Sequence, residues 1–152
     1  MISTRSRYGL RALIDLIIHY KGKPVMLKDI ASREGISERY LENIFTRLRT
    51  AGILKSSKGR KGGFYPARSA GDIRLLDIVE TLEKDTAFSS CVDEPSACSR
   101  SRSCISREAW TTVNRSFRQS LEAVSLADLI KDSEKSPAKR VNFSGEDLRS
   151  DV

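Results

Sequence analysis

Residues 37–68 read SERYLENIFTRLRTAGILKSSKGRKGGFYPAR, an amphipathic segment followed by a basic glycine-rich segment. Between residues 38 and 50 the apolar side chains recur every three or four positions, which predicts a helix with one buried face. Ser37 is placed to cap its first turn, and Gly52 to end it. Residues 53–54 and 64–65 then predict two short strands, and the turn at 55–63 holds four Lys or Arg residues and no acid.

A second, shorter helix precedes this stretch. Apolar residues between Leu27 and Ala31 predict it, and Gly35 is placed to end it. Two short helices joined by a glycine-containing turn and followed by a hairpin are typical of a winged helix-turn-helix. We therefore predict a mainly α fold with a small β-hairpin, in which residues 1–84 form a winged helix-turn-helix domain that begins with a helix at 5–20.

The chemistry of residues 37–63 favours double-stranded DNA as the partner. The helix at 37–50 can enter the major groove, led by Ser37, Glu38, Arg39 and Glu42, because arginine reads guanine and a carboxylate accepts from cytosine. Lys58, Arg60 and the glycine amides of the turn can contact phosphates or enter the minor groove. The alternative interpretation is a solvated charged helix beside a surface hairpin.

Composition narrows the choice of partner and function. The net charge of +7 and the isoelectric point of about 9.5 favour an anionic partner, either nucleic acid or a membrane surface. No apolar run of 18 residues is present, so we expect no membrane span. We also expect no signal peptide, and therefore a cytoplasmic location. His19 is the only histidine, and without a nucleotide loop or paired carboxylates the chain is not expected to be an enzyme.

A long helix is predicted near the C-terminus, capped by Ser103 and running to Val124. Its apolar residues follow a coiled-coil-like spacing. We expect this seam, within residues 105–131, to form a homodimer, and the alternative is that it packs on its own winged domain. A short helix is expected at 125–130, and residues 132–152 are predicted to be a disordered tail. The seam residues are Trp110, Val113, Phe117, Leu121 and Val124.

Residues 85–104 form a serine-rich segment that we predict to be a loop, and it carries all three cysteines. The spacing of Cys91, Cys98 and Cys104 is too wide for a zinc ribbon and differs from the common ferredoxin runs. Three thiols in so short a segment favour a metal or redox site, with an iron–sulfur cluster, a zinc site and a thiol switch all left open.

Together these segments resemble the IscR/NsrR/RirA-type family of winged-helix transcriptional regulators. The resemblance covers residues 1–131 and rests on five motifs. They are RYGLRALIDL, LKDIASREGISERYLENIFTRLRTAGIL, SSKGRKGGFYPAR, DIRLLDIVETLE, and the three-cysteine segment with the following REAW.

The resemblance implies a dimeric regulator of promoter DNA whose binding depends on an iron–sulfur cluster held by the three cysteines, 2Fe–2S being favoured over 4Fe–4S. It implies DNA contacts from Arg39, Tyr40 and Glu42 on the helix, and from Ser57, Lys58 and Gly59 on the wing.

The sequence departs from the family's fourth cluster ligand. IscR-like members place a histidine three residues after the last cysteine, where this chain has Arg107, and NsrR-like members place an aspartate where it has Tyr8. Asp93, Glu94 and Glu108 are the nearby oxygen donors. Lys58 also stands where the family usually has arginine, which keeps the charge but weakens bidentate contacts.

Overall fold

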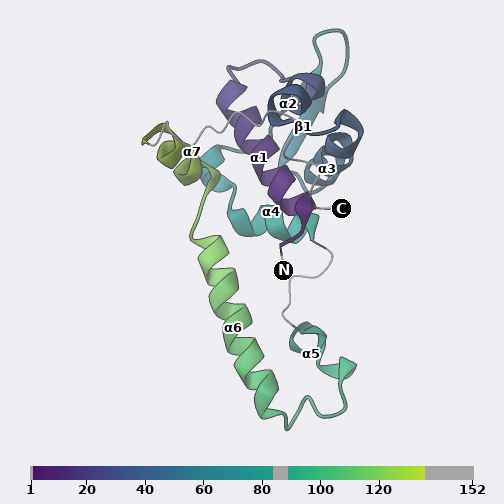
Figure 1. The fold of residues 1–152 in the computed structure, drawn as a ribbon, viewed down its shortest axis with the longest axis vertical. Coiled ribbons are helices and arrows are strands. Elements are labelled where there is room, and N and C mark those ends of the chain that lie inside the picture. The colour runs from purple at the N-terminus through teal and green to yellow at the C-terminus, as the bar shows by residue number, and fades with distance from the viewer. Residues whose placement is uncertain (1, 84–88, 136–152) are drawn as a thin grey trace.

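Three helices form the helix-turn-helix that positions the rest of the chain. The computed structural model describes residues 2–83 and 89–135. Figure 1 shows the first three helices grouped at one end of the molecule. They are α1 (Thr4–His19), α2 (Leu27–Glu34) and α3 (Glu38–Thr50).

Local capping explains where α2 and α3 begin and end. Gly35 adopts φ 65°, a left-handed conformation that lets the chain turn directly from α2 into α3. The Ser37 hydroxyl accepts a hydrogen bond from the Tyr40 amide at 3.3 Å, which confirms the predicted cap. Helix α3 ends at Thr50, and Gly52 follows in a left-handed conformation, as predicted.

A charged cluster joins α1 to α2. Asp15 is only 6% exposed, and it accepts hydrogen bonds from Arg33 Nε at 2.9 Å and Arg33 Nη2 at 2.7 Å. These bonds raise the pKa of Arg33 above its ordinary value. His19 Nδ1 lies 2.8 Å from the Asp15 carbonyl oxygen and 3.2 Å from Asp15 Oδ1, so its ring is part of this cluster.

The wing is an antiparallel hairpin of β1 (Leu54–Ser57) and β2 (Gly63–Pro66). The predicted range of the first strand, residues 53–54, is therefore wrong, because Lys55, Ser56 and Ser57 belong to the strand and not to the turn. Pairing with β2 lengthens β1, and β2 also pairs with Val25 through Phe64. Gly63 faces Val25 so closely that a Cβ there would lie 2.3 Å from the Val25 carbonyl oxygen.

The core lies between the three helices, the wing and α4 (Leu75–Leu82), which follows the short η1 (Ala70–Asp72). The apolar spacing of residues 73–82 predicts that this helix starts near Leu76 or Asp77, and α4 begins at Leu75. Phe45 of α3 meets Phe64 of β2 edge to face, with ring centroids 5.1 Å apart. The largest fully buried side chains are Phe45, Leu13, Leu16, Ile30, Leu41, Ile44, Leu48, Ile53, Leu54, Ile73, Ile78 and Leu82.

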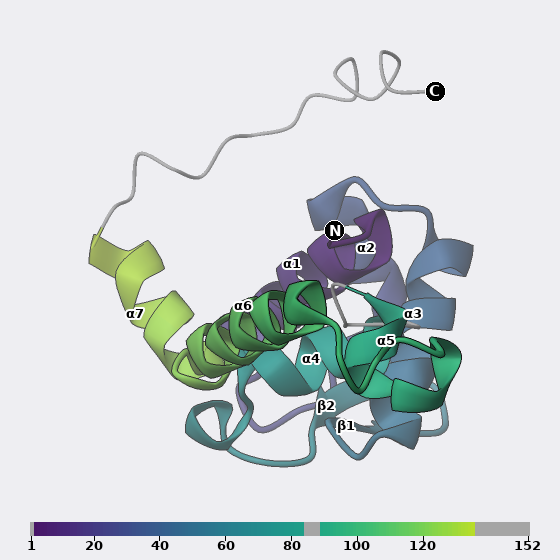
Figure 2. The same cartoon turned by 90° about the horizontal axis from the view of Figure 1, so that it is seen from below.

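The second half of the chain extends away from this core and then returns to it, where Leu126 is fully buried. It contains α5 (Ser90–Asp93), η2 (Pro95–Ala97), α6 (Ile105–Glu122) and α7 (Leu126–Lys135). Helix α6 extends away from the winged domain, with α5 beside its N-terminal end (Figures 1 and 2). The hairpin turn lies at the opposite end of the molecule (Figure 1).

Several predictions for this half need correction. The N-cap of α6 is Cys104 and not Ser103, and the helix ends at Glu122 before the predicted Val124. The segment predicted to be a loop contains α5 and η2, while residues 84–88 lie outside the described residues. Helix α7 extends to Lys135, four residues into the predicted disordered tail, of which residues 136–152 lie outside the described residues.

The C-terminal end of α6 is tied to the winged domain, whereas two large apolar side chains in its N-terminal half stay exposed. Arg118 forms an ion pair with Glu80 of α4, and the Leu126 amide donates to the Ile73 carbonyl at 3.0 Å. Trp110 and Val113 are 47% and 43% exposed. Across residues 2–83 and 89–135, no helix is long and apolar enough to cross a membrane.

Candidate DNA-binding surface and cysteine segment

The first turns of α3 present the side chains predicted to contact bases. Ser37, Arg39 and Glu42 are all exposed. Within the described residues the Arg39 and Glu42 side chains make no hydrogen bond or ion pair, so both are available to a ligand. Their opposite charges, one turn apart, suit a guanine acceptor edge and a cytosine amino group.

Tyr40 has a packing role that the sequence did not reveal. Its ring meets Tyr8 of α1 edge to face, with centroids 6.1 Å apart, and it remains 37% exposed. The Arg11 guanidinium carbon lies 5.6 Å from the centroid of the Tyr8 ring. Tyr40 therefore connects the surface of α3 to α1, and this contact involves residues too distant in sequence for periodicity to predict.

The four residues predicted to contact DNA from the wing divide into two environments. Lys58, Gly59 and Arg60 lie exposed in the hairpin turn. Ser57 ends β1, and its hydroxyl oxygen is buried with no hydrogen-bond partner in the described part of the chain. A contact from Ser57 to DNA would therefore use its backbone. Arg49 of α3, which sequence reasoning did not single out, donates to the Ser56 hydroxyl at 3.2 Å and so links α3 to the wing.

The three cysteines are free thiols distributed along the segment before α6. Cys91 is half-buried in α5, with its Sγ 3.2 Å from the Ser89 hydroxyl, and Cys104 is half-buried at the N-cap of α6. Cys98 is exposed. The donor chemistry suits an iron–sulfur cluster. Among the described residues, however, no three Cys, His, Asp or Glu side chains are gathered as a metal site would need.

The oxygen donors considered for a fourth ligand are likewise not gathered with the thiols. Asp93, Glu94 and Glu108 are exposed, and Glu94 accepts a hydrogen bond from the Ser96 hydroxyl. A cluster held by the three cysteines would therefore require the segment between them to close into a tighter arrangement.

Arg107 joins this segment to α6, a contact that the sequence analysis did not anticipate. Its Nε donates to the Cys91 carbonyl oxygen at 2.7 Å. Its only sequence signal is its position three residues after Cys104, on the first turn of α6.

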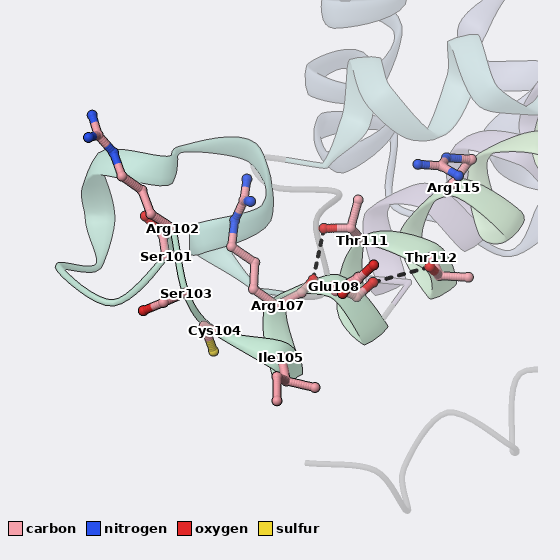
Figure 3. A pocket seen from close by; sticks show the side chains of 10 residues that line it. All are labelled: Ser101, Arg102, Ser103, Cys104, Ile105, Arg107, Glu108, Thr111, Thr112 and Arg115. Carbon is pink, nitrogen blue, oxygen red and sulfur yellow. Dashed lines mark hydrogen bonds between the residues drawn. The ribbon is translucent and has the colours of Figure 1, made fainter.

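An open cavity of about 530 Å³ lies between the end of the cysteine segment and α6 (Figure 3). Arg102, Arg107 and Arg115 line it together with several hydroxyl groups, and Glu108 is the one acidic side chain among the lining residues. The cavity that Cys104 helps to line therefore carries more positive than negative charge. Positive charge nearby favours negatively charged ligands such as thiolates.

The sequence matches the model of a family described as an iron-dependent transcriptional regulator, Rrf2, over residues 2–132. The chain belongs to the Rrf2 family. It is 39% identical over 143 residues to Protein rrf2 of Nitratidesulfovibrio vulgaris, an alignment that covers 94% of this chain and 95% of that protein.

Solved structures of proteins similar to this chain have the same fold. The T. potens IscR structure superposes with a TM-score of 0.72 at 36% identity, covering 90% of each chain. The structure of CymR, described as the global cysteine regulator of B. subtilis, superposes with a TM-score of 0.70 at 30% identity, covering 87% of this chain and 97% of that one.

These relationships confirm several predictions. The chain is an Rrf2-type transcriptional regulator with a winged helix-turn-helix, as the resemblance implied. Rrf2 and IscR proteins are DNA-binding regulators and not enzymes, which confirms the predicted non-enzymatic role.

Proposed function

We propose that this Rrf2-family protein binds promoter DNA as a homodimer and that an iron–sulfur cluster held by Cys91, Cys98 and Cys104 modulates the binding. The observation that carries the proposal is the position of the thiols. All three lie on the one segment that joins the winged domain to α6. Any change in the shape of that segment is therefore placed to move α6 relative to the DNA-binding surface.

The proposed DNA contacts come from α3 and the wing. Ser37, Arg39, Tyr40 and Glu42 face the major groove, with Arg39 and Glu42 reading base edges. Lys58, Gly59 and Arg60 of the wing, with the Ser57 backbone, hold the phosphates. Because the partner is DNA, we place the protein in the cytoplasm.

The proposed dimer uses the uncovered face of α6. Trp110 and Val113 are large apolar side chains that stay about half exposed in the single chain, and Phe117 and Leu121 continue their seam at helical spacing. A second copy of the same helix would cover this face and give the two-fold symmetry that pseudo-palindromic DNA requires. Val113→Glu should convert the dimer to a monomer in sedimentation analysis. Ile105→Glu is the control, because Ile105 is 86% exposed and lies outside the seam.

The proposed regulation is a change in the arrangement of the two recognition helices. A bound cluster would supply iron–thiolate bonds that draw the three cysteines of residues 91–104 together. The chain would pass this change in shape to the winged domain through α6, which is tied to α4 by the ion pair of Arg118 with Glu80. A difference of about 1–3 kcal/mol between the two arrangements would change promoter affinity about 5- to 150-fold.

Anaerobic native mass spectrometry of the freshly purified protein tests the cofactor and the assembly together. We expect a dimer with one cluster per chain, and 2Fe–2S is favoured over 4Fe–4S on the resemblance to IscR-like proteins. Mobility-shift assays with and without the cluster then test regulation, and identical affinity for every promoter would contradict it.

A second candidate keeps the DNA binding but uses the cysteines without a cluster, as a thiol switch or a zinc site. Two observations favour the thiol switch over a site that holds a metal. The thiols are not gathered into a metal-binding group within the described residues, and the solved relatives include a CymR described as an oxidized form, at 31% identity and a TM-score of 0.67. A dimer that carries bare thiols or zinc, without iron and sulfide, would favour this candidate.

A further inference from the structure

Arg107 contacts the backbone of two of the three cysteines. Its side-chain Nε donates to the Cys91 carbonyl at 2.7 Å, and its own amide donates to the Cys104 carbonyl at 3.2 Å. The two carbonyls belong to the first and last cysteines of the segment. The second bond belongs to the backbone of the first turn of α6, so the Arg107 side chain alone brings Cys91 to the helix that follows Cys104.

We propose that Arg107 is a positioning residue that holds Cys91 against α6 and so keeps the cysteine segment partly closed before any cofactor binds. This inference deepens the proposed cluster function and rests on it for its redox consequence. A guanidinium cannot ligate iron, because it stays protonated and has no free lone pair to offer. Arg107 therefore serves the site as a hydrogen-bond donor and a fixed positive charge.

The contact lowers the entropy that closing the segment must overcome. A free segment of this length would have to bring its ends together at the moment of cofactor binding, at a cost that grows with the length of the loop. With the Cys91 backbone already held on α6, only the middle of the segment, around the exposed Cys98, has to move. Cys91 also keeps its Sγ beside the Ser89 hydroxyl, a donor that can stabilise a thiolate.

No other arginine of the segment has such a role. Within the described residues, Arg100 and Arg102 are exposed and make no side-chain hydrogen bond or ion pair. Arg107 is half-buried and is one of the residues that line the cavity, and its terminal Nη groups have no partner in the described residues. In Figure 3 its guanidinium and the Cys104 sulfur point in opposite directions. A positive charge fixed there favours the more negative state of a thiolate-ligated centre, which raises its reduction potential.

Hydrogen exchange in the metal-free protein tests the positioning role without the cofactor. The amides of Val92 and Glu94 donate within α5 at 2.9 Å, so they report whether α5 stays folded on α6. In Arg107→Gln these amides should exchange about tenfold faster, the factor expected when a hydrogen bond from a charged group is lost. Arg102→Gln is the matched control and should exchange like wild type. Unchanged exchange in Arg107→Gln, with α1 peptides equally protected in both proteins, would overturn the proposal.

The reduction potential of the anaerobically reconstituted protein gives the readout that a purely structural role would not move. Arg107→Gln should lower the reduction potential. Arg107→Lys keeps the positive charge but loses the planar guanidinium group, so its reduction potential should stay near that of wild type. Equal potentials in wild type and Arg107→Gln would overturn the charge role. If wild type takes up no iron while exchange responds as expected, the cluster proposal fails and the positioning role of Arg107 stands.

Discussion

The ring of Tyr8 packs edge to face against the ring of Tyr40, and this contact joins the first helix of the chain to the surface of the recognition helix. Aromatic pairs of this kind contribute about 0.5–1.5 kcal/mol beyond their buried area. Tyr8→Leu should therefore loosen the start of α3 and weaken promoter binding about three- to tenfold, as measured by fluorescence anisotropy with a labelled duplex.

Tyr8→Phe is the matched control, because it keeps the ring and removes only the hydroxyl. It should bind DNA like wild type. Equal affinity for Tyr8→Leu and wild type would mean that the contact does not hold the recognition helix in its binding orientation.

Arg39 and Lys58 should affect DNA binding in different ways. Arg39→Ala removes a proposed base contact, so it should cost about 1–3 kcal/mol on the specific site and reduce the preference over unrelated DNA. Lys58→Ala removes a proposed phosphate contact, so it should weaken all sequences alike and lower the slope of log affinity against log salt by about one.

Titrations on specific and scrambled duplexes at several salt concentrations separate these two effects. Lys131→Ala, an exposed charge on α7, is the control and should leave both the specificity and the salt slope unchanged. A uniform loss for Arg39→Ala across all sequences would exclude a role in base readout.

The winged domain could be predicted because its signals are local. The apolar period of α3, the Ser37 cap and the left-handed Gly35 each act within a few residues. The extent of β1 could not be predicted in this way, because its length depends on pairing with β2, which is itself held by Val25. Local signals therefore place Ser57 in the turn, although it ends the strand.

The cysteine segment was harder to predict because its order comes from a few local hydrogen bonds and one distant contact. The single turn of α5 is too short to show an apolar period, so serine-rich composition alone indicated a loop. The three cysteines were evident as a group from spacing. The Arg107–Cys91 bond spans 16 residues, and sequence spacing carries no signal for such a contact.

Gly63 should be intolerant of any side chain. A Cβ at this position would lie 2.3 Å from the Val25 carbonyl oxygen, which pairs with the Phe64 amide at 2.9 Å. Gly63→Ala should therefore separate the wing from the Val25 segment and destabilise the fold by about 1–3 kcal/mol, the usual cost of overpacking. Urea unfolding measures this loss.

Gly71→Ala provides the control for Gly63→Ala. Its added Cβ would meet nothing closer than the Ser69 hydroxyl oxygen at 3.8 Å, an ordinary contact distance. We expect its unfolding midpoint to stay near that of wild type. Comparable losses for the two variants would show that the effect comes from the glycine backbone and not from the contact with Val25.

Glu83 makes the stability of the winged domain dependent on pH. It follows α4 and accepts a hydrogen bond from the Ser3 amide at 2.8 Å, at the N-terminus of α1. Burial raises the pKa of this carboxyl, but hydrogen bonds at the start of α1 and the charge of Arg5 outweigh burial, so the pKa lies below its ordinary value of 4.5. The ionised form therefore stabilises the folded state.

Linkage between protonation of Glu83 and folding determines how the stability changes with pH. Because the pKa is lower in the folded chain, the stabilisation is complete above about pH 4.5 and is lost as the pH falls through the folded-state value. Glu83→Gln should be less stable than wild type at pH 7, by about 1–2 kcal/mol for the weakened bond to a charged acceptor. The difference should shrink toward about pH 3, because protonation removes the charge from wild type as well.

Urea unfolding of both proteins between about pH 3 and pH 7 measures this dependence. Glu122→Gln is the control: Glu122 is exposed at the end of α6, and its side chain makes no hydrogen bond or ion pair within the described residues. Its stability should follow wild type across the whole range. A constant difference between Glu83→Gln and wild type at every pH would show that Glu83 acts through packing, because loss of a neutral contact does not titrate.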